Sequence, residues 1–205
     1  GSGRVDALKG IDASIPMGKV TAVVGPSGSG KSSLLRILAG LDRPTEGSAE
    51  VAGTDVGRAS AADLRRLRRR IGYVFQRPSD NLVSYLTVKE HVILAARLRK
   101  LSEVDADEIL HDLGLGARAN HHPEQLSGGE QQRAAFAQAV AGDPPLVVAD
   151  EPTAEIDSTT AEALLSTIRK LADRGLTIVV ATHDPAVMGV TDTSIRLHHG
   201  EVVGR

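Results

Sequence analysis

The chain has 205 residues, a net charge of −2 and a pI near 6.4, and hydrophobic residues make up 41% of it. This composition supports a single folded unit with a normal core and excludes wholesale disorder. It offers no overall positive field for nucleic acid, and only 2% of residues are aromatic and able to stack on bases. We therefore expect no nucleic-acid partner.

The chain contains no cysteine, which excludes disulfides, thiolate catalysis and zinc ribbons. Its longest aliphatic runs, such as residues 146–149 and 178–181, are far shorter than the roughly 20 apolar residues of a membrane-spanning helix. No basic-then-apolar leader opens the sequence. A cytosolic domain that does not itself cross a bilayer is the expectation.

Short β-branched runs alternate with helix-spaced apolar residues along the chain. This alternation predicts an α/β fold with a mainly parallel sheet, interrupted by a separate helical lobe. The predicted strands cover residues 20–24, 71–75, 146–149 and 177–181. The predicted helices cover residues 34–38 and 161–172, with further helical spacing between about 78 and 142.

A glycine-rich segment joins the first predicted strand to the first predicted helix, with the pattern G-x-x-x-x-G-K-S. Its glycines let successive backbone N–H groups turn toward a polyphosphate, aided by the positive end of the following helix. Lys31 would reach the β- and γ-phosphates, and the Ser32 hydroxyl would bind magnesium. The segment predicts a nucleotide site rather than a plain hairpin loop, and it consists of Gly25, Pro26, Ser27, Gly28, Ser29, Gly30, Lys31 and Ser32.

Two carboxylates, Asp150 and Glu151, follow the apolar run Leu146–Ala149. Asp150 would hold magnesium, directly or through water. Glu151 lies one residue further, where it can act as a general base on an attacking water. The plainer interpretation is a capping pair after a strand, and the phosphate loop argues against it.

A second glycine-rich turn, Leu126-Ser127-Gly128-Gly129-Glu130-Gln131-Gln132-Arg133, opens a predicted helix from Gln131 to about Val140. It resembles the signature motif of ATP-binding-cassette ATPases. Other motifs of that family follow in the expected order: Gln76 after a strand, Ala154–Asp157 after the carboxylate pair, and His183 after the last strand. Taken singly, each of these residues has a plainer interpretation: Gln76 is a polar residue at a strand end, Asp157 is a helix N-cap and His183 is a loop histidine.

The resemblance implies a phosphate-loop NTPase core, about residues 1–75 and 143–205, with an antiparallel β portion and an inserted helical subdomain, about residues 76–142. It also implies a head-to-tail dimer of two nucleotide-binding domains. ATP would lie between the loop Gly25–Ser33 of one copy and the turn Ser127, Gly128, Gly129 and Glu130 of the other. The cofactors would be ATP and Mg²⁺.

Residue roles follow from the same resemblance. Gln76 would contact magnesium and the attacking water, alongside Ser32 and Asp150 as metal-binding residues. His183 would bond the γ-phosphate and orient the water, while Glu151 acts as the base. Asp157 would lie at the dimer seam. The other histidines lack ligand-like spacing, and the pair His121-His122, before Pro123, is expected to be structural.

One departure concerns the aromatic residue on which this family commonly stacks adenine. No aromatic residue precedes Tyr73, and the expected position falls at or just before Gly1. Loss of such a contact would weaken ATP binding by about 1–3 kcal/mol.

The segments 40–47 and 126–137 resemble most the lipoprotein-release, macrolide-exporter and cell-division group. They favour an ATPase subunit that powers a transmembrane permease on a separate chain, on the inner face of the cell membrane. Segment 76–82 is similar to vitamin and metal importers, which leaves the transport direction open. A cell-division ATPase that remodels a membrane protein is the alternative. DNA-repair ATPases of this type are disfavoured, because only 96 residues and no heptad stretch separate Lys31 from Ser127.

Overall fold

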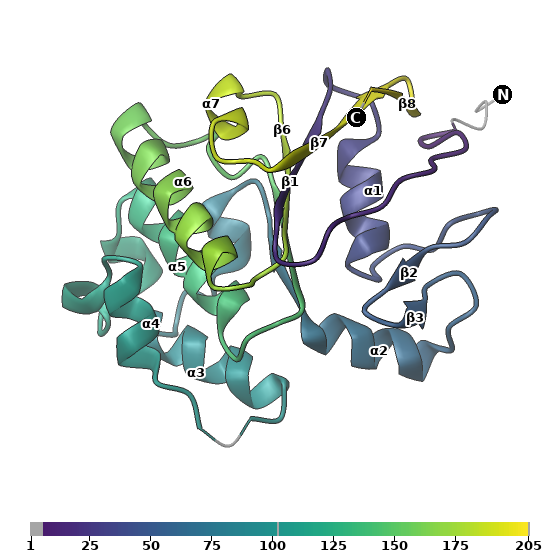
Figure 1. The fold of residues 1–205 in the computed structure, drawn as a ribbon. Helices are drawn as coiled ribbons and strands as arrows, with labels where there is room; N and C mark the ends of the chain where they lie inside the picture. The colour runs from purple at the N-terminus through teal and green to yellow at the C-terminus, as the bar shows by residue number, and fades with distance from the viewer. Residues whose placement is uncertain (1–5, 102, 205) are drawn as a thin grey trace, which may run out of the picture.

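A six-stranded sheet forms the centre of the molecule in the computed structural model, which describes residues 6–101 and 103–204 (Figure 1). The strand order is β4-β5-β6-β1-β7-β8, and every neighbouring pair is parallel except β7 with β8. The strands are β1 (Val20–Val24), β4 (Ile71–Val74), β5 (Leu146–Asp150), β6 (Ile178–Thr182), β7 (Thr193–His198) and β8 (Glu201–Gly204).

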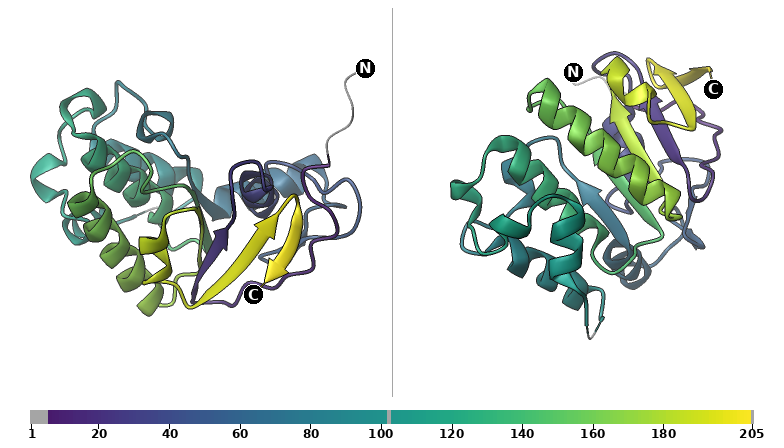
Figure 2. Two further views of the ribbon diagram at one scale, coloured as in Figure 1. Left: turned by 90° about the horizontal axis from the view of Figure 1, so that it is seen from above. Right: turned by 60° about the vertical axis from the view of Figure 1, so that its left-hand side comes forward.

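Helices cover both faces of this sheet, which is why its inner strands are continuously apolar. Alternate residues of β5 point to different cores: Val147 and Ala149 join one, Leu146 and Val148 the other. In Figure 1 the helices α1 and α2 lie to one side of the strands, and Figure 2 shows α3, α4, α5 and α6 on the other. These helices are α1 (Lys31–Leu38), α2 (Ala61–Arg70), α3 (Val88–Leu98), α4 (Ala106–Asp112), α5 (Gly128–Val140) and α6 (Ser158–Asp173).

Two antiparallel hairpins extend this parallel architecture. The strands β2 (Glu50–Val51) and β3 (Thr54–Asp55) form a separate small sheet, and they turn at Ala52 and Gly53, which both have positive φ. The hairpin β7–β8 turns at His199 and Gly200, again with positive φ. Consecutive positive φ angles match the twist of a tight hairpin. The antiparallel portion of the expected fold is therefore present.

The chain between β4 and β5 contains only helices and turns in the part that the structure describes. Besides α3, α4 and α5 it holds three short 3₁₀ turns, η1 (Pro78–Asn81), η2 (Gly116–Arg118) and η3 (Pro123–Gln125). The helix α5 fastens this segment to the sheet, since Phe136 is fully buried in the same core as β5 and β6. A Cβ on Gly72 of β4 would lie 2.5 Å from the Ala139 carbonyl oxygen, so α5 and β4 approach closely.

The predicted strands and helices are confirmed, and most of their ends shift by one to three residues. The strand predicted to end at Phe75 ends at Val74. The helix predicted to start at Gln131 starts at Gly128, because Ser127 caps it. The Ser127 hydroxyl accepts from the Glu130 N–H at 3.3 Å, and the Glu130 carboxylate accepts from the Ser127 N–H at 2.8 Å. This reciprocal capping box places the helix start at the two glycines, which have low intrinsic helix propensity.

Among the described residues, no helix combines the length and the apolar character that crossing a membrane requires. The longest helix, α6, has 16 residues and buries one face only. Its buried residues Ala161, Leu164, Leu165, Ile168 and Ala172 follow the predicted three-and-four spacing.

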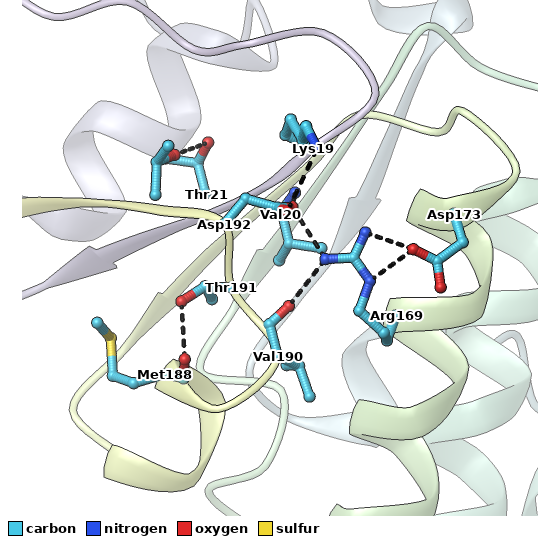
Figure 3. Close-up of polar contacts among 10 residues, drawn as sticks. Lys19, Val20, Thr21, Arg169, Asp173, Met188, Val190, Thr191 and Asp192 are labelled. Atoms are coloured by element: carbon cyan, nitrogen blue, oxygen red, sulfur yellow. Dashed lines mark hydrogen bonds and ion pairs between the residues drawn. The ribbon is translucent and has the colours of Figure 1, made fainter.

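An ionic cluster joins α6 to the amino ends of β1 and β7 (Figure 3). Arg169 on α6 donates to Asp192 at 2.9 Å and to the Val190 carbonyl at 3.3 Å. The Asp192 carboxylate also accepts from the Val20 N–H at 2.8 Å. These hydrogen bonds, the one from Val20 foremost and then the one from Arg169, lower the pKa of Asp192 to about 2. The charged carboxylate therefore stabilises the fold.

We predict that Asp192→Asn lowers the urea midpoint of unfolding at pH 7, and that the difference from wild type shrinks as the pH falls. A depressed pKa stabilises the folded state above the unfolded value near 3.8, and this stabilisation is lost as the pH drops toward 2. Asp173→Asn, which removes a 64%-exposed partner of the same arginine, is the control and has a smaller effect. A midpoint difference that is the same at pH 7 and pH 3 would contradict this role of Asp192.

Candidate functional site

The carboxyl ends of four adjacent parallel strands bring one group of the predicted site residues together. Gln76 follows β4, Asp150 ends β5 and Glu151 comes directly after it, His183 follows β6 and the phosphate loop follows β1. Because the strand order is β4-β5-β6-β1, these segments lie side by side along one edge of the sheet. Ligands of open parallel sheets bind at such an edge. Residues from four distant parts of the sequence thereby become neighbours.

The phosphate loop between β1 and α1 is held in a fixed conformation. Gly28 and Gly30 have φ angles of 77° and 100°, values that residues other than glycine rarely adopt. A Cβ on Gly30 would also lie 2.5 Å from the Ala7 carbonyl oxygen. From the β7–β8 turn, the Gly200 N–H donates to the Ser29 carbonyl at 3.0 Å. The loop is thus braced from two sides before any ligand binds, and α1 begins directly behind it.

The Lys31 ammonium group lies inside the loop and is almost buried. It donates to the carbonyls of Gly25 at 2.8 Å and Pro26 at 3.3 Å, and lies 3.5 Å from a Glu151 carboxylate oxygen. A buried ammonium requires such partners, because an unpaired charge costs several kcal/mol in a protein interior. Together with the backbone N–H groups at the start of α1, it offers positive charge to an anionic ligand.

Asp150 and Ser32 provide oxygen atoms suited to a magnesium ion. Burial raises the pKa of Asp150. A hydrogen bond with Ser32 and the charge of Lys31 lower this pKa, whereas the charge of the neighbouring Glu151 raises it. One Asp150 carboxylate oxygen is buried and has no hydrogen-bond partner. A buried orphan oxygen beside a hydroxyl matches the hard oxygen ligands that Mg²⁺ prefers. The residues present therefore fit this ion.

Glu151 is held by both its backbone and its carboxylate. Its φ of 47° lies in the left-handed region, where a residue other than glycine is strained. Its N–H donates to the Ala181 carbonyl at 2.9 Å, which continues the pairing of β5 with β6. The carboxylate lies 3.0 Å from Nδ1 of His183 and accepts from the His183 N–H at 3.3 Å. Lys31, Glu151 and His183 thus form one connected polar cluster.

Two further residues that the sequence did not single out hold the loop after β6. The Thr153 hydroxyl donates to the Asp184 carboxylate at 3.0 Å, which ties the loop after β5 to the loop that carries His183. The Asp184 N–H donates to the Thr182 hydroxyl at 2.9 Å. Thr153 and Asp184 are far apart in the sequence, and only the order of the strands makes them neighbours. The sequence therefore gives no signal for their contact.

The signature turn forms a second, separate part of the site at the start of α5. Ser127 and Gly128 are exposed. Glu130 is fixed by Arg118, whose Nε donates to it at 2.8 Å, and this hydrogen bond, with those from Ser127, lowers the pKa of Glu130 to about 2. Gly129 packs so closely on Thr160 of α6 that any Cβ would overlap that side chain. The turn is therefore rigid as well as exposed.

Asp157 adjoins this turn and caps α6, as its plainer interpretation proposes. Its carboxylate accepts from the Thr160 N–H at 3.0 Å and from the Thr160 hydroxyl at 2.6 Å. Asp157 itself is exposed. The hydrogen bonds of the described residues do not join Asp157 or Ser127–Glu130 to the Lys31, Glu151 and His183 cluster.

Gln76 is the last of the predicted site residues. Gln76 lies at the expected edge and is exposed, in a loop held by Asn81, which the sequence analysis did not identify. No group of three or more His, Asp or Glu residues within the described chain could hold a metal by itself. The position expected for the adenine-stacking aromatic, at or before Gly1, lies outside the described residues.

Comparisons with known proteins show which family this chain is similar to. The profile of the ABC transporter family matches residues 8–154. An uncharacterized ABC transporter ATP-binding protein of Thermotoga maritima is 43% identical over 209 aligned residues, covering 100% of this chain and 88% of that protein. The macrolide export ATP-binding/permease protein MacB of Escherichia coli K12 is 41% identical over 99% of this chain, which spans only 32% of MacB.

A solved structure has the same fold. It is the dimeric, post-hydrolysis state of the ATP-binding cassette MJ0796 bound to ADP and Pi, with a TM-score of 0.89 and 38% identity. The match covers 100% of this chain and 91% of that one.

Proposed function

Because this chain belongs to the ABC transporter family, we propose that it is the nucleotide-binding subunit of an exporter and that two copies bind ATP between them, head to tail. The chain is an ATPase, and ATP and Mg²⁺ are what its site binds. The observation that carries the proposal is the division of the site. One part is a buried phosphate loop with its carboxylates, and the other is a rigid signature turn exposed to solvent.

In the proposed reaction, the phosphate loop and Lys31 bind the polyphosphate of ATP. The Lys31 ammonium exchanges its bonds to the loop carbonyls for bonds to phosphate oxygens, where it neutralises charge on the transferred group. Ser32, Asp150 and Gln76 would hold magnesium, which supplies further charge neutralisation when bound. Glu151 accepts a proton from the attacking water, and His183 orients the water and the γ-phosphate.

The cluster of Lys31, Glu151 and His183 gives this assignment a physical basis. The Glu151 carboxylate lies 3.5 Å from the Lys31 ammonium and 3.0 Å from Nδ1 of His183, and it accepts from the His183 backbone N–H. The strained backbone of Glu151 and its bond to Ala181 fix where that carboxylate lies. Such positioning is what a general base requires.

The signature turn is proposed to act on the second copy. Ser127 presents a hydroxyl at a helix start, where unpaired N–H groups attract anions. Glu130, Gly128 and Gly129 shape this turn. Asp157, which accepts from the hydroxyl of Thr160, the side chain against which Gly129 packs, is exposed as well. In a head-to-tail dimer each turn would close the phosphate loop of the other copy, which gives two complete sites. Asp157 would then lie at the seam between the copies.

A membrane partner is supported by apolar side chains that are exposed in the loop after β4, residues 75–87, and on the helix α3 that follows it in sequence. Phe75 and Tyr85 lie in this loop and are 40% and 76% exposed. Leu94 and Leu98, one turn apart on α3, are exposed as well. Several large apolar side chains exposed along one segment of the chain are typical of an interaction surface. We propose that a permease on a separate chain docks here, which would hold the ATPase on the inner face of the cell membrane.

The export direction rests on the similarity to MacB, whose name describes macrolide export, and on the sequence of segments 40–47 and 126–137. The helical segment would act as a subdomain that carries the signature turn, with boundaries near residues 75/76 and 142/143. In this arrangement a movement of the segment relative to the core changes how Ser127 meets the partner's phosphate loop.

We predict that Glu151→Gln lowers ATP turnover by about 10²–10⁴-fold while ATP binding is retained, because the amide keeps the shape but accepts no proton. Steady-state hydrolysis and a separate titration of ATP binding measure the two effects. Glu162→Gln, an exposed change on α6, serves as the matched control. Normal turnover in Glu151→Gln would exclude the general-base role.

We predict that Lys31→Ala abolishes measurable ATP binding, since the loop loses its buried cation. Equilibrium titration with ATP and Mg²⁺ tests this prediction. Lys170→Ala on α6 removes an equal charge from an exposed position and leaves binding unchanged. Wild-type affinity in Lys31→Ala would contradict the assignment of the phosphate loop.

We predict that the Glu151→Gln chain shifts from 21.5 kDa to twice that mass when ATP and Mg²⁺ are added, as measured by size exclusion with light scattering. Unhydrolysed ATP would remain between the two copies and hold them together. The Lys31→Ala, Glu151→Gln double variant stays monomeric. A variant that binds ATP tightly yet keeps the monomer mass would contradict dimer formation by this chain alone.

A further inference from the structure

We propose that Asn81 is a positioning residue for hydrolysis: its side-chain amide fixes the backbone on both sides of Gln76. This inference rests on the role proposed for Gln76 at magnesium and the attacking water. Asn81 ends η1, is 8% exposed, and lies five residues beyond Gln76.

One side chain makes hydrogen bonds to both neighbours of Gln76. The Asn81 Oδ1 atom accepts from the Phe75 N–H at 2.7 Å. Its Nδ2 group donates to the Phe75 carbonyl at 3.1 Å and to the Arg77 carbonyl at 2.9 Å, with the Pro78 carbonyl further away at 3.4 Å. Gln76 therefore sits on a backbone that is held immediately before and immediately after it.

These bonds continue the pairing of β4 beyond its last residue. The strand ends at Val74, so Phe75 is the first residue beyond its register with β5. An amide is the side chain that can replace a strand neighbour here, since it offers an acceptor and two donors in one plane. Asparagine at this position thus prolongs the order of the strand up to Gln76.

Asn81 also connects Gln76 to the helix that carries the signature turn. The turn η1 packs against α5, which begins directly after Ser127. A change in the position of α5 would be transmitted through η1 and Asn81 to the backbone at Gln76. The same side chain thereby links the two separate parts of the nucleotide site.

The far end of the loop is held independently, which confines the effect of Asn81 to the Gln76 side. His91 is fully buried, and its Nε2 accepts from the Val83 N–H at 2.7 Å. Its Nδ1 lies 2.7 Å from the Thr87 carbonyl, which it can reach as a donor. Tyr85 lies between these two contacts and is exposed. A change at Asn81 leaves this second anchor and the exposed Tyr85 segment in place.

The test compares Asn81→Ala with Gln76→Ala and with Ser79→Ala, an exposed control in the same turn. ATP hydrolysis by the full chain is measured as a function of Mg²⁺, and ATP binding is titrated separately. Asn81→Ala is expected to lower kcat by about 10- to 100-fold, because a misplacement of about 1 Å has effects of this size. It is also expected to raise the Mg²⁺ concentration for half-maximal rate, as Gln76→Ala does, with ATP affinity nearly unchanged.

The variant Asn81→Asp gives a readout that a purely structural role would not produce. An ionised carboxylate accepts from the Phe75 N–H but repels the two carbonyls, whereas a protonated one donates to a carbonyl again. Burial and these carbonyls raise the pKa of such a carboxyl group. Activity relative to wild type is therefore expected to rise as the pH is lowered from 8.5 to 6, while the ratio for Asn81→Ala stays constant. If Asn81→Ala does not fold, the pH dependence of Asn81→Asp still tests the positioning role of Asn81.

The possible failures are distinguishable. Wild-type kinetics in both Asn81 variants, with an impaired Gln76→Ala, would overturn the role of Asn81 and leave the proposed function intact. Wild-type kinetics and Mg²⁺ dependence in Gln76→Ala would overturn the role proposed for Gln76, and the inference about Asn81 with it. A pH-independent defect in Asn81→Asp would reduce Asn81 to a structural residue.

Discussion

The Lys31 ammonium group must be paired where it lies, almost buried between the loop carbonyls and the Glu151 carboxylate, at the carboxyl edge of a parallel sheet. Pairing of this kind requires a loop that follows β1 and a carboxylate that follows β5, two strands away. The strand β6 between them supplies His183, which holds the same carboxylate from the other side. The order of the strands thus determines the chemistry that this edge can perform.

The exposed signature turn is held in place in a different way from Lys31. No buried charge anchors Ser127; a capping box, the Arg118 contact of Glu130 and the packing of Gly129 on Thr160 fix it instead. A turn this rigid loses little entropy when it binds an anion, which favours binding. Two preorganised surfaces on one chain, one concealed in the sheet edge and one exposed, are what a site shared between two copies requires.

Much of this could be predicted from the sequence, because local rules govern it. The glycine spacing before Lys31 predicts a phosphate loop, and the buried runs predict the strands β1, β4, β5 and β6 to within one residue at each end. The contacts of Asn81, and of Thr153 with Asp184, could not be predicted, since they depend on which strands and loops become neighbours. Likewise, the pairing of His183 with Glu151 follows from β5 lying beside β6, which no local pattern encodes.

A site shared by two copies is tested most directly by the ATPase rate per chain as a function of chain concentration. If each site needs a loop from one copy and a signature turn from the other, the rate per chain rises with concentration and levels off when the dimer is fully formed. A rate per chain that stays constant down to concentrations at which light scattering shows only the 21.5 kDa monomer would contradict a shared site.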